Sequence, residues 1–235
     1  MSGSQAVLVS LACALLLYNL FANRWPPFNG PWYVPLNLAV TGVVVLVGLG
    51  PLGLTWRNLA GTFEARGFVV GVGAGLVVTV PLLVGSLWRR TARLIRDERV
   101  AHLRGWTLAY QTLIRIPLGT ALLEEVAFRG VLFAGWRHLG DLQAAVLSSV
   151  IFGLWHVGPT INMVRMNRPG ASPGAVVRTV AGAVVFTTLA GLLFVWLRIE
   201  WGLAAPLLMH ATVNSLSTVA SVLAHRRLAA VSAPR

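Results

Sequence analysis

Residues 116–130 of the chain read Ile116-Pro-Leu-Gly-Thr-Ala-Leu-Leu-Glu124-Glu125-Val-Ala-Phe-Arg129-Gly130. Two adjacent glutamates stand about nine residues into an apolar run, and a second apolar run follows them. Inserting a carboxylate at membrane depth costs at least a few kcal/mol, so ionisable residues placed there usually serve a function. The apolar character extends over residues 112–136, which is long enough for a helix that crosses a bilayer.

Six further stretches have the length and apolar character of membrane-spanning helices. They cover residues 5–22, 34–54, 67–88, 141–157, 176–197 and 203–223. Only 11% of the 235 residues are charged, which is less than half of the roughly 25% usual in soluble domains. The predicted fold class is therefore all-α, a polytopic transmembrane helical bundle of seven or eight helices. The first helix is expected to be retained, because it lacks the features of a signal peptide.

One bundle is expected, since neither a long linker nor a repeat of 20–50 residues divides the chain. Residues 1–110 are predicted to form N-terminal transmembrane helices, and residues 111–225 a core that carries the polar side chains. Residues 89–106 have arginines at helical spacing, which indicates either an amphipathic helix on the cytoplasmic membrane surface or a solvated basic loop. Gly71 and Gly75 are typical of a helix-packing face rather than of a phosphate-binding loop.

The charge of the chain is one-sided, with 19 basic residues, all arginine, against 7 acidic ones. Such an excess often indicates nucleic acid. In so apolar a chain, however, arginines between helices more simply mark loops that stay in the cytoplasm beside anionic lipid. Alternation of the spans puts twelve arginines on that side and leaves four outside, at positions 57, 66, 137 and 198. Membrane lipids, and no nucleic acid, are the predicted partners, with an outside N-terminus and a cytoplasmic C-terminus.

The two glutamates are predicted to have different surroundings. Glu125 and Arg129 are four residues apart on a helix and can form an ion pair along one face. Glu124 points ~100° away and lacks that partner. We interpret Glu125 and Arg129 as a brace and Glu124 as the working carboxylate, a general base that accepts a proton from water. In the alternative interpretation all three residues only lock helix packing.

Two further patches place polar residues in predicted spans. Phe152-Gly-Leu-Trp-His156 brings Phe152 and His156 onto one helix face, and His210-Ala-Thr-Val-Asn214 does the same for its two end residues. The structural alternatives are an interfacial histidine and an asparagine in a simple interhelical hydrogen bond.

Together these groups can converge on one water molecule. A glutamate would take its proton, a histidine would orient it, and the others would stabilise the oxyanion. Two histidines and a carboxylate are equally a catalytic zinc set, formed here by Glu124, His156 and His210. The sequence lacks an H-E-x-x-H helix, a G-x-S-x-G elbow and paired intramembrane aspartates, so zincin, serine and aspartyl mechanisms have no support. The single cysteine, Cys13, excludes a disulfide and a Cys metal cluster.

The three patches, in this order, resemble the motifs of the CAAX protease and bacteriocin-processing (CPBP) family of intramembrane proteases, which includes the Ras-converting type. That family shows Glu-Glu-x-x-x-Arg, Phe-x-x-x-His and His-x-x-x-Asn on successive helices. The matching positions here are Glu124, Glu125 and Arg129, then Phe152 and His156, then His210 and Asn214. Phe128-Arg129-Gly130 and Trp201-Gly202-Leu203 agree as well, and the resemblance covers about residues 115–220.

The resemblance implies that residues 111–225 form a CPBP-like core with a cavity open to the cytoplasm and the membrane. It implies an intramembrane endopeptidase that hydrolyses peptide bonds of membrane-embedded or lipidated proteins and peptides. Glu124 would activate water with His156, while His210 and Asn214 would hold the oxyanion. Glu125 and Arg129, with Phe152, would support the site. No obligatory cofactor is expected, and a divalent metal such as zinc is the alternative.

The composition, rich in Gly, Ala, Val and Arg, is typical of a bacterial chain, for which we expect a multi-pass plasma-membrane protein and no prenylated CAAX substrate. The main alternative function is a membrane binding or bacteriocin self-immunity protein that keeps the fold and does not cut. The intact set of candidate catalytic residues argues against it. A small transporter or channel has less support, because no repeat relates the two halves of the sequence and no pair of broken helices occurs. The sequence predicts no particular oligomeric state.

Overall fold

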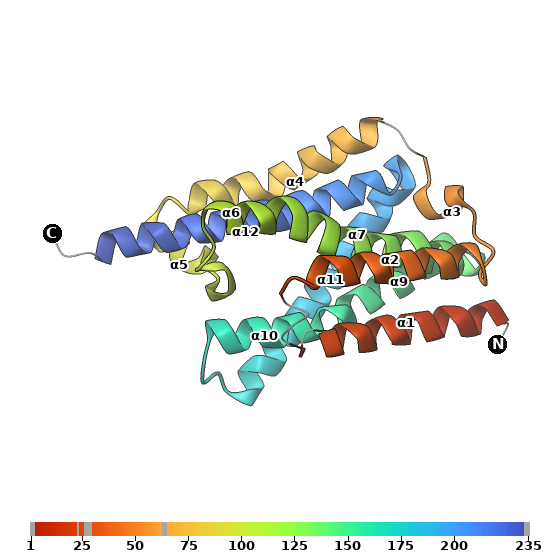
Figure 1. Ribbon diagram of the computed structural model, residues 1–235, viewed down its shortest axis with the longest axis horizontal. Helices are drawn as coiled ribbons and strands as arrows, with labels where there is room; N and C mark the ends of the chain where they lie inside the picture. The colour runs from red at the N-terminus through yellow and green to blue at the C-terminus, as the bar shows by residue number, and fades with distance from the viewer. Residues whose placement is uncertain (1–2, 23, 26–29, 63–64, 233–235) are drawn as a thin grey trace.

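The computed structural model describes residues 3–22, 24–25, 30–62 and 65–232, and within these ranges the chain is helical with no β-strand. Most of the long helices run along the long axis of the molecule, and α11 crosses them obliquely (Figure 1). In chain order the longer helices are α1 (Gly3–Ala22), α2 (Tyr33–Leu49), α4 (Ala65–Gly85), α9 (Asp141–Trp155), α10 (Val157–Asn167), α11 (Pro173–Trp201) and α12 (Ala204–Ser232). The short helices α3 (Trp56–Ala60) and α5 (Arg89–Ile95) stand before and after α4.

Five helices of the described chain are long and apolar enough to cross a membrane. They are α1, α4 with the residues before it, α9 continued by α10, α11 and α12, and α2 is a shorter apolar helix. The all-α polytopic class is thereby confirmed, and the chain is an integral membrane protein. Each of the seven predicted stretches is helical over most of its length. The count of seven or eight spans, and the division of the chain at residue 110, stay predictions.

The predicted span 112–136 lies in a composite helix that runs from Gly105 to Trp136. Its pieces are α6 (Gly105–Tyr110), the π-helix η3 (Gln111–Ala121), α7 (Leu122–Glu125), the π-helix η4 (Val126–Leu132) and α8 (Phe133–Trp136). Pro117 has no N–H to donate, which removes one ordinary helical hydrogen bond, and the N–H of Leu122 donates to the Pro117 carbonyl five residues back. The single α-helical turn between the two π stretches carries both glutamates.

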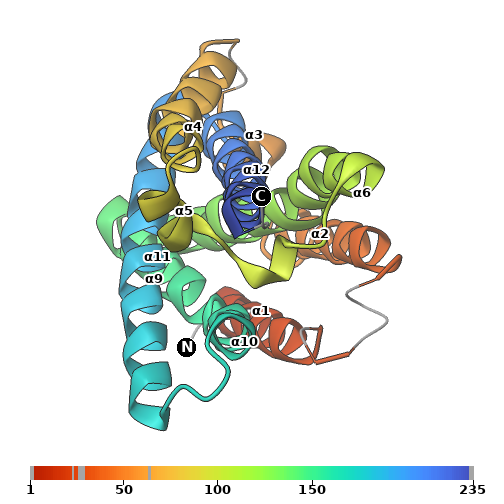
Figure 2. The same ribbon diagram turned by 90° about the vertical axis from the view of Figure 1, so that its left-hand side faces the viewer.

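The composite helix forms the centre of the bundle and contacts α2, α9, α11 and α12. Viewed along the helices, α4 and α1 lie on opposite sides of it (Figure 2). Its side chains Phe128, Val131, Leu132 and Phe133 are almost completely buried. A helix that is apolar on all sides is expected in such a central position. The two glutamates of this helix therefore lie in the interior of the bundle.

The helix that carries the Phe152 patch continues further than predicted. After α9 ends at Trp155, the chain bends at His156 and resumes as α10. The sequence gives no apolar signal for α10, because Thr160, Asn162 and Asn167 interrupt it. The bend leaves His156 at the junction of two helices.

Residues 89–106 form neither one amphipathic helix nor a free loop. The seven-residue helix α5 is followed by extended residues, the 3-10 turn η2 (Glu98–Val100) and a turn that leads to Gly105. We name residues 96–104 the strap. Its Asp97 N–H donates to Ser221 Oγ of α12 at 2.7 Å, and its Glu98 N–H donates to Asn167 Oδ1 of α10 at 2.9 Å. Tertiary hydrogen bonds therefore override the helical spacing of the arginines.

Helices α4 and α12 pack through the predicted small-residue face, which is confirmed. A Cβ added at Gly71 would meet the carbonyl of Ala205, and one added at Gly75 would lie 2.6 Å from the Cβ of Thr212. Gly73, on the other side of α4, has nothing within 4 Å of its Cβ position.

Gly75→Ala is therefore expected to lower the free energy of unfolding by about 1–3 kcal/mol, the usual cost of overpacking. Gly73→Ala is the matched control and is expected to be neutral or slightly stabilising, because alanine is the better helix former. Thermal unfolding of the two purified variants in detergent measures the difference. Equal melting temperatures would contradict the close packing of α4 on α12.

Candidate active site

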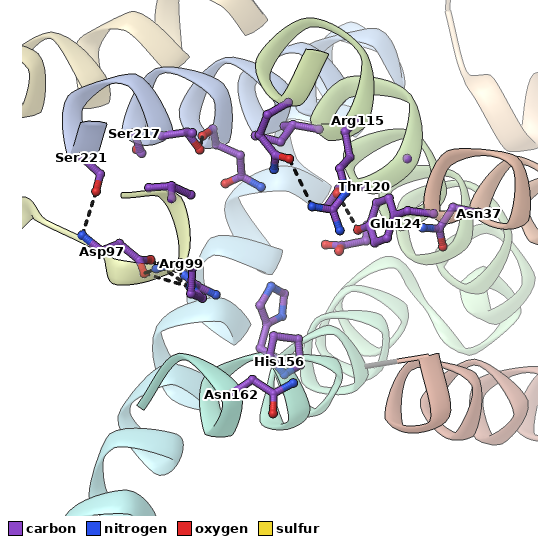
Figure 3. A pocket seen from close by; sticks show the side chains of 18 of the residues that line it. Asn37, Asp97, Arg99, Arg115, Thr120, Glu124, His156, Asn162, Ser217 and Ser221 are labelled. Carbon is purple, nitrogen blue, oxygen red and sulfur yellow. Dashed lines mark hydrogen bonds and ion pairs between the residues drawn. The ribbon is translucent and has the colours of Figure 1, made fainter. Parts of the chain in front are cut away.

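A cavity of about 1010 Å³ lies between α1, α2, the strap, the composite helix, α10 and α12. Candidate residues from all three sequence patches line it, namely Glu124, His156 and Asn214. Figure 3 shows the Glu124 carboxylate and the His156 ring directed into this cavity from different helices. The fold thus brings together residues that are up to 90 positions apart in the sequence.

Glu124 is buried, with 6% of its surface exposed, and its two oxygens differ. Oε1 accepts a hydrogen bond of 3.0 Å from the indole Nε1 of Trp155. Oε2 has no hydrogen-bond partner and lies 3.8 Å from His210 Nε2. That distance is too long for a hydrogen bond, and Oε2 is itself a buried atom. One oxygen is thus held by a hydrogen bond and the other is not.

Glu125 forms the expected ion pair with Arg129, at 3.3 Å between Oε1 and Nη1, and both side chains are completely buried. The same Oε1 accepts a hydrogen bond of 2.7 Å from His210 Nδ1. Because Nδ1 is engaged by Glu125, Nε2 is the nitrogen of His210 that faces Glu124. The brace therefore also orients one of the candidate catalytic histidines.

The guanidinium of Arg129 is surrounded by aromatic rings. It lies 3.9 Å from the ring centre of Phe152 and 5.0 Å from that of Phe194, distances typical of cation–π contacts. Phe194 also stacks on His210, with 5.3 Å between ring centres. The charge is thus stabilised by Glu125 on one side and by ring faces on the others.

His156 is held by the residue four positions before it. Its Nδ1 lies 2.8 Å from the carbonyl oxygen of Phe152, and because a carbonyl only accepts, Nδ1 carries the proton. The ring also meets the Phe152 ring edge-to-face at 4.6 Å. This arrangement sets the tautomer and leaves Nε2 for a molecule in the cavity. Phe152 thus contacts both His156 and Arg129.

Asn214 follows His210 by one turn of α12 and lines the same cavity. Its side-chain amide can donate a hydrogen bond to a bound molecule. The predicted common face of His210 and Asn214 thus meets the composite helix, with His210 beside the two glutamates and Asn214 nearer the strap.

Two residues of the cavity have contacts that the sequence did not predict. Trp155 is the hydrogen-bond donor to Glu124. Arg115 donates to Gln111 at 3.1 Å and lies 4.0 Å from the ring centre of Tyr33. Regular helical spacing would put Arg115 and Glu124 ~180° apart, whereas the π-helical turns between them bring both to one cavity. Pro117 is the signal in the sequence that marks this irregularity.

The strap bounds the cavity at its far end. Burial raises the pKa of Asp97, but hydrogen bonds from Arg99 and Asn167 outweigh burial and hold the pKa below its ordinary value. The carboxylate is therefore charged at neutral pH. Its oxygens lie 2.6 Å from Arg99 Nη2 and 3.0 Å from Asn167 Nδ2. The strap is consequently tied both internally and to α10.

Glu124, His156 and His210 are the donors that a catalytic zinc ion would require. In the described ranges of the chain, no three His, Cys, Asp or Glu side chains lie close enough together to hold a metal ion. Nδ1 of His210 is engaged by Glu125, and its Nε2 stays 3.8 Å from Glu124. A carboxylate on the second ring nitrogen is common for a metal-ligating histidine, but His156 is not gathered with Glu124 and His210 into a three-donor group in the described residues.

A comparison with protein families gives a match. Residues 106–216 match the family model described as Rce1-like, type II CAAX prenyl endopeptidase. The matched range contains all three sequence patches and most of the composite helix. Neither the curated proteins nor the solved structures gave a match.

Arg129→Ala is expected to lower the free energy of unfolding by about 3–5 kcal/mol, because it leaves the buried Glu125 carboxylate without its cation. Asp141→Ala is the matched control. It breaks a pair of the same spacing, Arg137–Asp141, whose side chains are both 51% exposed, so a loss of at most about 1 kcal/mol is expected. Thermal unfolding and the yield of membrane-inserted protein report the effect. A small loss in both variants would argue against the brace.

Proposed function

Since the chain belongs to the Rce1-like CAAX protease family, we propose that it is an intramembrane endopeptidase in which Glu124 activates a water molecule. Its substrates are membrane-embedded or lipidated proteins or peptides. The observation that carries the proposal is the asymmetric environment of Glu124. Trp155 fixes Oε1, while Oε2, which has no partner, faces His210 Nε2 beside a cavity shared with His156 and Asn214.

In the proposed reaction, Oε2 of Glu124 takes a proton from water as its oxygen attacks the scissile carbonyl carbon. The carbonyl π electrons move to oxygen and form an oxyanion. When the carbon–nitrogen bond breaks, the proton held by Glu124 passes to the leaving amine. A positioned general base of this kind typically contributes about 10²–10⁴-fold to the rate.

The other side chains position the water and the oxyanion. Nε2 of His156 can accept a hydrogen bond from the water, because Nδ1 is already committed as a donor to Phe152. The Asn214 amide donates to the oxyanion, and His210 Nε2 does so when it carries a proton. Hydrogen-bond donors fixed in advance at a developing negative charge lower the barrier most in a site with little water.

The cavity is proposed to open to the cytoplasm of a bacterial cell. It is lined by Arg99 and Arg165, which belong to the side richer in arginine, whereas Arg57, Arg137 and Arg198 line a separate pocket. The positive-inside rule places the richer side in the cytoplasm. A volume of about 1010 Å³ is large enough for a short stretch of peptide, because pockets for drug-sized ligands span about 300–1,000 Å³.

Glu124→Gln is expected to reduce cleavage by at least about 100-fold while the protein stays folded, because the amide oxygen can still accept the Trp155 hydrogen bond. The measurement compares new protein termini in membranes of cells that carry wild type, Glu124→Gln, or the exposed control Glu200→Gln. Termini that depend on Glu124 alone identify substrates. If all three membranes, with equal expression, show the same termini, the self-immunity or binding function would replace the protease.

Hydrolysis is proposed to need no metal, because the base and the oxyanion donors are supplied by side chains. Turnover by purified protein on a substrate identified in this way is therefore expected to survive dialysis against a strong chelator. An inactive dialysed enzyme that zinc restores would contradict the proposal and would make the donor set of Glu124, His156 and His210 a metal site formed on binding.

A further inference from the structure

A second pocket, of about 260 Å³, lies between α3, the residues after α8, and the end of α11. It is at the end of the bundle opposite α5 and the strap (Figure 1). Three arginines from distant parts of the sequence line it, namely Arg57, Arg137 and Arg198. Its described lining contains no carboxylate.

Arg198 is the buried member of the three, with 7% of its surface exposed. Its Nη2 donates to the carbonyl oxygens of Asn58 at 2.7 Å and Leu59 at 3.2 Å. Its Nε is buried and has no hydrogen-bond partner. No ion pair joins Arg198 to a carboxylate in the described part of the chain, and a buried charge without a counter-charge is unfavourable. The guanidinium thus has backbone acceptors but no counter-charge among the described residues.

The backbone around Arg198 is shaped to hold its guanidinium. A Cβ added at Gly61 would collide with Arg198 Nη1, and Gly61 has a φ of +71°, which favours glycine. The next helix is tied to the same place, because Leu203 N–H donates to the Ala60 carbonyl at 2.8 Å. The guanidinium therefore lies in a formed cradle.

The three arginines do not contribute equally to the charge of the pocket. Arg137 is compensated by Asp141, with hydrogen bonds of 2.8 and 3.0 Å. Arg57 is exposed and has no ion pair with any carboxylate of the described residues. The described lining thus holds two positive charges, on Arg57 and Arg198, without a partner carboxylate.

Tryptophans place this pocket at the membrane surface. Trp56, 65% exposed, directly precedes Arg57, and Trp196, 50% exposed, stacks edge-to-face with Trp201 near the end of α11. Tryptophan is enriched at the level of the lipid headgroups. A basic pocket between helices at that level is suited to an anionic headgroup.

We propose that the pocket of Arg57, Arg137 and Arg198 binds a phosphate group, held by guanidinium groups that match its oxygens. The tryptophans favour the phosphate of an anionic lipid in the leaflet opposite the catalytic cavity. The site needs no proteolysis to function, so it stands or falls independently of the proposed activity.

The test measures thermal unfolding of the purified full chain in a neutral detergent. Phosphatidylglycerol, phosphatidylcholine and inorganic phosphate are each titrated at constant ionic strength. Phosphatidylglycerol is expected to raise the melting temperature, and Arg57→Ala to weaken its apparent affinity about fivefold, the effect of removing one arginine near a charged membrane surface. Arg178→Ala, an exposed arginine near the other end of α11, is the matched control and should behave as wild type.

Stabilisation by phosphatidylglycerol that depends on Arg57, with none by phosphatidylcholine, would support the lipid site. The same Arg57-dependent shift with inorganic phosphate alone would support the site with a free anion as its occupant. No shift with either anion, or an equal loss in the Arg57 and Arg178 variants, would overturn the proposal.

Discussion

The buried ion pair of Glu125 and Arg129 is the interaction on which the polar centre of this bundle depends. Neither side chain is exposed, so each charge has lost its water and requires partners within the protein. Glu125 gains His210 from α12, and Arg129 gains the rings of Phe152 from α9 and Phe194 from α11. Four helices thus meet around one pair of charges. Apolar contacts alone would not fix the positions of these helices relative to one another.

This constraint also separates the tasks of two adjacent glutamates. One residue along a helix is a rotation of ~100°, which directs Glu124 away from Arg129 and toward Trp155 and the cavity. His210 lies between the two carboxylates, bonded to Glu125 at 2.7 Å and 3.8 Å from Glu124. The Glu125 carboxylate therefore determines which nitrogen of His210 faces Glu124. A change at Glu125 would disturb the proposed site even though Glu125 is assigned no contact with a substrate.

The sequence was sufficient where the relevant interaction follows helical spacing. The Glu125–Arg129 pair and the contact of Phe152 with His156 are four residues apart, and apolar length alone located most of the helices. The sequence was insufficient where contacts between residues far apart in the chain determine the structure. The strap is held by Ser221 and Asn167, which no local pattern reveals. Arg115 reaches the cavity because π-helical turns break the 3.6-residue period, and α10 has too many polar residues to be recognised as a helix.

The two ends of the bundle differ in how the charge of an arginine is compensated. At the cavity end Arg99 is neutralised by Asp97 of the strap. At the other end Arg198 is buried without a carboxylate among the described residues. Helix α11 has 29 residues, about 44 Å of helix, which is longer than a hydrocarbon core of ~30 Å. Tilting is one way to accommodate that length, and α11 runs obliquely to the other long helices (Figure 1). Because α11 also carries Phe194, which contacts His210 and Arg129, an anion bound at Arg198 would fix one end of the helix that supports the proposed active site.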